Sequence, residues 1–279
     1  MDERTVRRYL DRIGVRRPGA PTADLLVELQ ARHLETVPFE NLSIHLGEPV
    51  VLTEDALVDK IVDRRRGGFC YELNGLFAAL LRALGFEVTL LSALVHTPNG
   101  LTHPFDHLAL RVDLEQRYLV DVGFGAHARR PLRLDWPDPQ LDPEGEFLVV
   151  DAGEGEVDVL QDGTPRYRVE PRARRLADFG PTCWWQQTSP DSHFTHGPTC
   201  SLPTANGRIT LAGTRLIRTV GGTRTETRLT DEDQVLAAYR EHFGIVLDRT
   251  PDYLLATRRY FATDNGTNTA RISTEDSTA

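Results

Sequence analysis

The feature that most constrains the fold of this chain is a basic, glycine-rich turn that leads into an apolar helix. The turn reads RRRGGFC over residues 64–70. Apolar residues then recur at helical spacing, and Gly85 is a typical helix end. Cys70 is therefore expected at the start of a buried helix, where free N–H groups and the helix dipole favour a thiolate. The alternative is a small buried cysteine behind an ordinary turn. The helical stripe consists of Leu73, Leu76, Phe77, Leu80, Leu81 and Leu84.

Composition restricts the classes of protein that this chain can represent. Its 279 residues are 40% hydrophobic and 26% charged, which is ordinary for a soluble globular protein. The formal charge of −9 argues against nucleic acid or an anionic membrane as the main partner. We expect one large domain or two to three small ones.

The cysteines and the N-terminus indicate the compartment. Cys70, Cys183 and Cys200 are an odd, widely spaced set, which is neither a disulfide framework nor a CxxC metal site. We therefore expect a reducing compartment and no metal. The chain opens on charged residues without an apolar signal segment, and no apolar run reaches membrane-spanning length. This pattern predicts a cytoplasmic protein with no membrane partner.

Residues 1–85 read as a small, entirely helical unit. Between the helices, the segment 37–42 shows no periodicity, and Glu40 and Asn41 suggest buried hydrogen bonds that hold a loop. A surface turn is the alternative for this segment. The expected helices run from Val6 to Ile13, from Thr22 to before Pro38, from Thr53 to Val62, and from Cys70 to Leu84.

The rest of the chain changes character after Gly85. Residues 86–185 alternate apolar and polar side chains between turn signals, which predicts an antiparallel sandwich or barrel. Residues 186–261 combine strand patterns with an amphipathic helix at 231–243. Residues 262–279 are rich in Thr, Asn, Ser and Asp, and we expect a disordered tail there.

His107 and Asp121 are the best candidates to assist a nucleophilic Cys70. A cysteine nucleophile needs a base, and the base needs a group that orients it. Both residues stand on predicted neighbouring strands, at an even separation. A hairpin with an odd-length loop would place both side chains on one face, whereas an even-length loop would separate them. Taken singly, each residue fits a structural role; taken with Cys70, they favour catalysis.

These residues lie in motifs that resemble the arylamine N-acetyltransferase family. The resemblance covers residues 1–130, in family order, and is weaker afterwards. It implies an α+β fold with an N-terminal helical bundle (1–85), a central antiparallel β-barrel (86–185) and a C-terminal α/β lid (186–261), built around a cysteine-protease-like Cys-His-Asp core. The matching motifs are PFENL at 38–42, RGGFC at 66–70, NGLF at 74–77, His107-Leu108 and VDVGFG at 120–125.

The resemblance also implies a chemistry and a set of site residues. Cys70, His107 and Asp121 would be the catalytic triad of a ping-pong acetyltransferase. Acetyl-CoA would be the co-substrate and would acetylate Cys70, and a small aromatic amine or hydrazine would then accept the acetyl group. Phe39, Phe124 and Phe194 would line the acceptor pocket.

The sequence leaves some alternatives open. An amide synthase that closes ansamycin-type macrolactams would share the triad, and so would a cysteine hydrolase of papain or transglutaminase type. A binding protein with an inactive triad is a further possibility. One departure from the family is Asp106, because many relatives carry Thr or Ser directly before the histidine. The sequence determines neither the CoA-binding residues nor the oligomeric state.

Overall fold

The structure is a computed structural model that describes residues 1–16 and 19–252. The predicted disordered tail at 262–279 therefore lies outside the described residues, as do residues 253–261 of the predicted lid.

The N-terminal part of the chain is helical, as predicted. The cap of the first helix is Asp2, whose carboxylate accepts the N–H of Thr5 at 2.8 Å. Gly14 ends this helix in the left-handed conformation, at φ 69°. Thr22 caps the second helix, which ends before Pro38. The helices are α1 (Glu3–Ile13), α2 (Ala23–Thr36), α3 (Leu42–Leu46), α4 (Glu54–Leu57), the π-helix η1 (Val58–Asp63) and α5 (Cys70–Ala83).

Two details of this helical part differ from the prediction. The expected helix from Thr53 to Val62 consists of the short α4 followed by η1, whose wider winding accompanies the burial of Lys60. The ammonium group of Lys60 lies 2.6 Å from the Glu72 carboxylate, a tertiary contact without a local sequence signal. Helix α3 was not expected, because five residues are too short to show helical periodicity.

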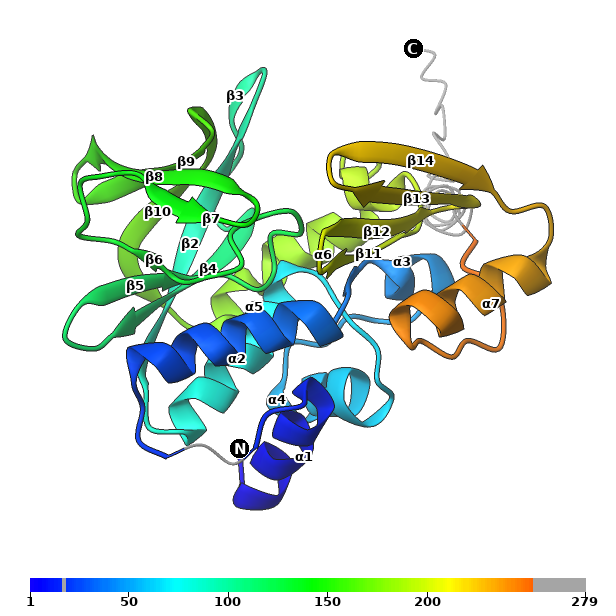
Figure 1. The fold of residues 1–279 in the computed structure, drawn as a ribbon, viewed down its shortest axis with the longest axis horizontal. Helices are drawn as coiled ribbons and strands as arrows, with labels where there is room; N and C mark the ends of the chain where they lie inside the picture. The colour runs from blue at the N-terminus through cyan, green and yellow to red at the C-terminus, as the bar shows by residue number, and fades with distance from the viewer. Residues whose placement is uncertain (17–18, 253–279) are drawn as a thin grey trace, which may run out of the picture.

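The central part forms an antiparallel sheet that curls into a nearly closed barrel, on the upper left of Figure 1. Its strands follow the order β6-β5-β4-β2-β10-β9-β8-β7, and β3 pairs with β2. The strands are β2 (Glu87–Thr97), β3 (Gly100–Leu101), β4 (His107–Asp113), β5 (Arg117–Val120), β6 (Leu132–Arg133), β7 (Gln140–Asp142), β8 (Gly145–Gly153), β9 (Glu156–Gln161) and β10 (Thr164–Arg174).

A second antiparallel sheet follows, on the right of Figure 1. It starts with β1 (Phe39–Glu40), a strand from the N-terminal part whose Phe39 pairs with Ser201. The loop motif at 37–42 is thus tied to the C-terminal sheet. The remaining elements are η2 (Leu176–Phe179), α6 (Gly180–Thr188), η3 (His193–Thr195), β11 (Thr199–Thr204), β12 (Gly207–Ala212), β13 (Arg215–Val220), β14 (Thr223–Arg228) and α7 (Glu232–Phe243).

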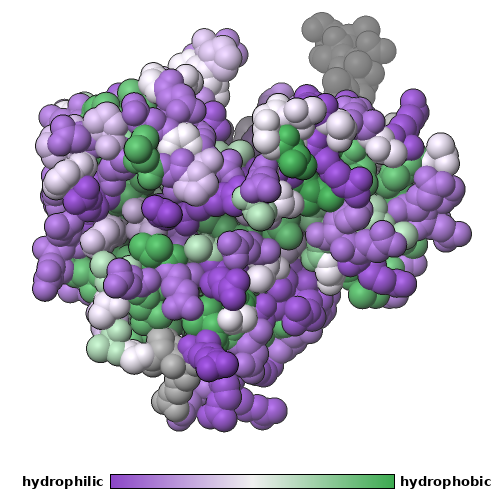
Figure 2. All heavy atoms as spheres, in the orientation of Figure 1, coloured by the Kyte–Doolittle hydropathy of each residue, from purple (hydrophilic) through white to green (hydrophobic). Residues whose placement is uncertain are grey.

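The largest hydrophobic core joins the helices to the barrel. It contains Leu73, Leu76 and Phe77 of α5 together with Leu108 and Leu110 of β4. Separate cores fill the barrel and the space between the second sheet and α7. The face shown in Figure 2 is mostly hydrophilic and is broken by smaller hydrophobic patches. The α+β architecture is confirmed, and the exact domain boundaries stay predictions.

Candidate active site

Cys70 is the first residue of α5 and is 4% exposed. The two glycines before it are required by close packing. A Cβ atom on Gly67 would lie 1.9 Å from the Pro38 carbonyl oxygen, and one on Gly68 would lie 2.7 Å from a Glu72 carboxylate oxygen. Glu72 also accepts the N–H of Phe69 at 3.2 Å. The turn therefore holds Cys70 at the helix start, as the sequence predicted.

His107 and Asp121 meet in the structure at hydrogen-bond distance. The His107 Nε2 and Asp121 Oδ2 atoms lie 2.7 Å apart, and both side chains are almost fully buried. The strands β4 and β5 pair with Asp113 opposite Arg117, so the loop between them has the odd length that the sequence left open. This register places the two side chains on one face of the hairpin.

Asn74 connects the carboxylate to the cysteine helix, a role that the sequence analysis missed. It lies one turn after Cys70 on α5, and its Nδ2 atom donates to Asp121 Oδ1 at 2.9 Å and to the Leu108 carbonyl at 2.7 Å. Its Oδ1 atom accepts the N–H of Val122 at 2.9 Å. The Asn74-Gly75 motif marked the position, but a single sequence does not show the partners.

The turn after Asp121 packs directly on Cys70. A Cβ atom on Gly123 would lie 2.7 Å from the Cys70 Cα atom, so this position requires glycine. The Gly123 N–H also donates to Asp121 Oδ1 at 2.8 Å. The structure thus brings Cys70, His107 and Asp121 into one buried cluster.

Burial governs the charges in this cluster. It raises the pKa of the Cys70 thiol well above its usual value, and the carboxylates of Asp106 and Asp121 act in the same direction. Burial is the largest single effect on Asp121 and opposes its ionisation, but the combined interactions with His107, His127 and Asn74 outweigh it and lower the pKa of Asp121 to about 2. The formation of a Cys70 thiolate at the helix start therefore stays a prediction. Ionisation of Cys70 needs a group that takes its proton.

The three predicted acceptor-pocket phenylalanines are all partly exposed. The Phe39 and Phe194 rings lie 6.1 Å apart, and Phe69, the residue before Cys70, lies 5.1 Å from Phe194. Phe124 packs edge-on against the His107 ring at 5.0 Å. These phenylalanines therefore surround the cluster from three different segments of the chain.

Asn41 holds the segment that carries Phe194. Its Nδ2 atom donates to the carbonyls of Phe194 and Gly197, both at 2.9 Å, and its Oδ1 atom accepts the N–H of Thr199 at 2.7 Å. Next to it, Glu40 is completely buried and pairs with Arg66 at 2.9 Å. The buried hydrogen bonding predicted for Glu40 and Asn41 is therefore present.

A tyrosine and a second histidine lie behind the catalytic candidates and were also missed. The Tyr167 ring lies 5.1 Å from the His107 ring, and its hydroxyl is hydrogen-bonded to His127 Nε2 at 3.0 Å. Burial lowers the pKa of His127 to about 4, so its ring is neutral at physiological pH. In the sequence, Tyr167 looks like an ordinary core residue of an alternating strand.

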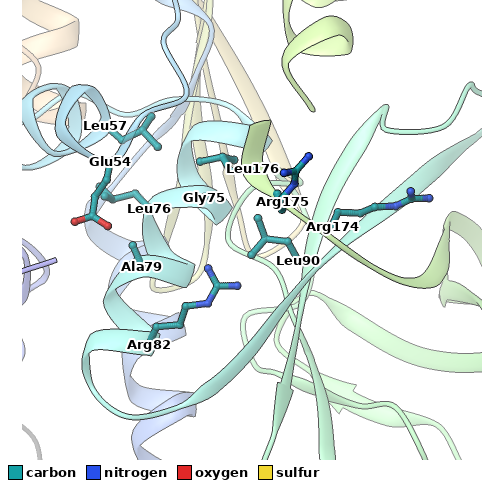
Figure 3. Close-up of a pocket in the computed structure, with 10 residues that line it drawn as sticks. All are labelled: Glu54, Leu57, Gly75, Leu76, Ala79, Arg82, Leu90, Arg174, Arg175 and Leu176. Carbon is teal, nitrogen blue, oxygen red and sulfur yellow. The ribbon is translucent and has the colours of Figure 1, made fainter. Parts of the chain in front are cut away.

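A distinct pocket of about 260 Å³ lies beside the middle of α5 (Figure 3). Its wall includes Gly75 and Leu176, and neither Cys70, His107 nor Asp121 lines it. Among residues 1–16 and 19–252, no group of three or more His, Cys, Asp or Glu side chains is arranged to hold a metal ion. No helix in this part of the chain combines the length and the apolar composition needed to cross a membrane.

Comparison with known proteins places this chain among enzymes. A family model described as N-acetyltransferase matches residues 22–251. The arylamine N-acetyltransferase of Mycolicibacterium smegmatis is 37% identical over 252 residues, which are 86% of this chain and 91% of that protein. The solved structure of the M. smegmatis arylamine N-acetyl transferase has a TM-score of 0.82 at 34% identity, covering 92% of this chain and 98% of that one.

A second solved structure agrees with this comparison. It is the Mycobacterium marinum arylamine N-acetyltransferase in complex with CoA, with a TM-score of 0.79 at 33% identity, covering 86% of this chain and 92% of that one. These likenesses define the class of the protein as an acyltransferase. The chain belongs to the arylamine N-acetyltransferase family, and the resemblance inferred from its motifs is confirmed.

Proposed function

We propose that this protein moves an acetyl group from acetyl-CoA to a small aromatic amine or hydrazine through an acetyl-Cys70 intermediate. The observation that carries the proposal is the buried cluster in which the turn at Gly123 packs on the Cys70 Cα atom while His107 Nε2 meets Asp121 at 2.7 Å. Because Asp121 occupies Nε2, Nδ1 is the ring nitrogen left to exchange a proton with the substrate side.

The first half-reaction transfers the acetyl group to the enzyme. His107 takes the proton of the Cys70 thiol, and the sulfur attacks the thioester carbonyl of acetyl-CoA. The backbone N–H of Cys70, at the start of α5, is positioned to stabilise the negative charge on that oxygen. The bond between the carbonyl carbon and the CoA sulfur breaks, and His107 returns the proton to CoA.

The second half-reaction releases the product. The acceptor amine attacks the acetyl-Cys70 thioester, and His107 takes a proton from the amine. The bond between the carbonyl carbon and the Cys70 sulfur breaks, and His107 passes the proton to the sulfur, which restores the thiol. Asp121 stabilises His107 while it is protonated.

Each part of the chain contributes to this site in the proposal. Residues 1–85 supply the nucleophile, and residues 86–185 supply His107 and Asp121. Phe39, Phe124 and Phe194 form the apolar wall for the aromatic ring of the acceptor, which their partial exposure around the cluster supports. Stacking on such rings favours flat aromatic acceptors.

Steady-state kinetics with acetyl-CoA and a neutral arylamine, 4-toluidine, tests this proposal. We expect CoA release, formation of N-acetyl-4-toluidine, and parallel double-reciprocal plots, because a ping-pong enzyme releases CoA before the amine binds. Intersecting plots would contradict the covalent route. Turnover only with long acyl chains on a carrier protein would favour the macrolactam-forming alternative, and amide cleavage without CoA would favour a hydrolase.

A further inference from the structure

The carboxylate of Asp106 stands beside the proposed active site and has no role in the mechanism above. It directly precedes His107, and its side chain is only 10% exposed. Its backbone carbonyl accepts the hydroxyl of Tyr71 at 3.1 Å, and Tyr71 directly follows Cys70. Asp106 is therefore linked to His107 through the backbone and to the neighbour of Cys70 through a hydrogen bond.

The side chain of Asp106 is held in place by a neutral group. Gln186 of α6, which is 1% exposed, donates its Nε2 hydrogen to Asp106 Oδ1 at 2.6 Å. The side-chain oxygen Oε1 of Gln186 in turn accepts a hydrogen bond from the Ser192 hydroxyl at 2.5 Å. This chain of hydrogen bonds fixes the carboxylate without neutralising its charge.

Few cations oppose this charge. In the described part of the chain, no arginine or lysine lies within 4.0 Å of the Asp106 carboxylate, and the nearest ionisable partner is His103 Nδ1 at 3.8 Å. Burial lowers the pKa of the nearby His193, which disfavours its positive charge. The negative charge of Asp106 acts in the opposite direction and raises the pKa of His193. The guanidinium of Arg174 lies over the Phe105 ring and pairs with Glu170 at 3.2 Å.

The charge of Asp106 also reaches the nucleophile. Asp106 is joined to Tyr71, the residue after Cys70, by a hydrogen bond at 3.1 Å, and its carboxylate acts to raise the pKa of the Cys70 thiol. An acceptor that attacks an acetyl group on Cys70 must bring its nitrogen to this sulfur. Its substituents therefore experience the field of a fixed, partly buried negative charge.

We propose that Asp106 determines acceptor specificity, favouring aromatic amines that carry a positive charge and disfavouring those that carry a carboxylate. This inference rests on the proposed function and names its substrate class. A unit charge held several ångströms away in a partly buried site changes binding by roughly tenfold or more. Neutral arylamines are the reference, since they experience no net attraction or repulsion.

The test compares three para-substituted anilines of different charge. They are (4-aminobenzyl)trimethylammonium, 4-toluidine and 4-aminobenzoate, each assayed with acetyl-CoA. For the wild type we expect kcat/KM for the cation, divided by that for the anion, to exceed the ratio in Asp106→Asn by roughly tenfold or more. Because each acceptor is compared with itself between variants, differences in amine reactivity cancel.

Two further variants sharpen the test. Asp106→Glu keeps the charge and should retain much of the preference for the cation. Asp233→Asn removes one negative charge from the exposed first turn of α7 and should leave the ratio unchanged. If Asp106→Asn lowers kcat/KM equally for all three amines, the residue acts on the common acetylation step and the inference is wrong.

An unchanged ratio in an active Asp106→Asn enzyme would also overturn the inference, while leaving the proposed function intact. In contrast, a wild type that acetylates none of the three amines would overturn the proposed function itself. The two failures are therefore distinguishable in one experiment.

Discussion

Replacing Asp121 with asparagine tests whether the buried carboxylate sets the position of the proton on His107. Asp121 accepts three hydrogen bonds, from His107 Nε2 at 2.7 Å, from Asn74 Nδ2 at 2.9 Å and from the Gly123 N–H at 2.8 Å. A carboxylate suits three donors because both of its oxygens accept. An amide has one accepting oxygen and one donating NH₂ group.

Either orientation of the new amide disturbs the site. If its oxygen faces Asn74 and Gly123, its NH₂ group faces His107 Nε2, which must then give up its hydrogen. The ring proton moves to Nδ1, and His107 can no longer take the proton of Cys70. If the amide is reversed, two buried donors face the NH₂ group, at about 1–3 kcal/mol each. The first orientation therefore prevails and gives a folded enzyme with the wrong tautomer.

The magnitude follows from this tautomer argument. In the serine-protease triad, the corresponding change lowers kcat about ten-thousandfold. We expect kcat/KM with 4-toluidine to fall roughly a thousandfold to ten-thousandfold in Asp121→Asn, or about 4 to 5.5 kcal/mol in the barrier. The melting temperature should fall only modestly, because two of the three hydrogen bonds remain.

The matched control is Asp113→Asn at the other end of β4. Asp113 pairs with Arg111 at 3.0 Å and is partly exposed, so its loss should leave activity near the wild-type level. An Asp121→Asn enzyme within about tenfold of wild type, an effect of about 1.4 kcal/mol, would refute the reasoning. Asp121 would then be a structural residue at a strand end, and Asp106 would be the first candidate to replace it.

Three other changes have defined outcomes. Asn74→Leu removes the hydrogen-bond partners of two buried backbone groups and one hydrogen bond to Asp121. The free energy of unfolding, measured in urea, should therefore fall by about 3 kcal/mol or more. A loss below about 1 kcal/mol would show that these bonds contribute little. Burial lowers the pKa of His33 from 6.5 to about 3, so stability is full above about pH 6.5 and is lost as the pH falls toward 3. The free energy of unfolding should be about 2 kcal/mol lower at about pH 5 than above pH 6.5 because of His33. His33→Phe should remove that part of the pH dependence, and an unchanged slope would show that His33 is not its source. Alkylation of Cys70 by limiting iodoacetamide at about pH 7 should slow markedly in His107→Gln, as peptide mapping can measure, whereas equal rates would mean that His107 does not take the thiol proton.

Local chemistry explains which elements could be predicted. The side chains of Asp2 and Thr22 accept hydrogen bonds from backbone N–H groups three residues later. Each helix start therefore depends on only four consecutive residues and can be recognised in the sequence. The cysteine turn was predictable for the same reason, because the closely packed Gly67 and Gly68 precede an apolar helical stripe. Helix α3 and η1 carry no such local signal and depend on tertiary packing.

The site could be predicted as a set of residues but not as a geometry. The even separation of His107 and Asp121 allowed one shared face, and the three-residue loop between β4 and β5 decided it. The bonds of Asn74 to Asp121 and of Tyr167 to His127 join segments far apart in the chain, and periodicity does not report such contacts. The near-complete burial of Cys70 could not be predicted either, because it depends on what packs around the helix start.

Intact mass spectrometry after incubation with acetyl-CoA alone tests the central claim most directly. We expect the wild type, and equally the Cys183→Ala and Cys200→Ala variants, to gain the mass of one acetyl group. Cys70→Ala should gain none, and adding 4-toluidine should return the acetylated proteins to their original mass. Acetylation of Cys70→Ala to the same extent as the wild type would contradict the account, because the acetyl group would then be carried by another residue.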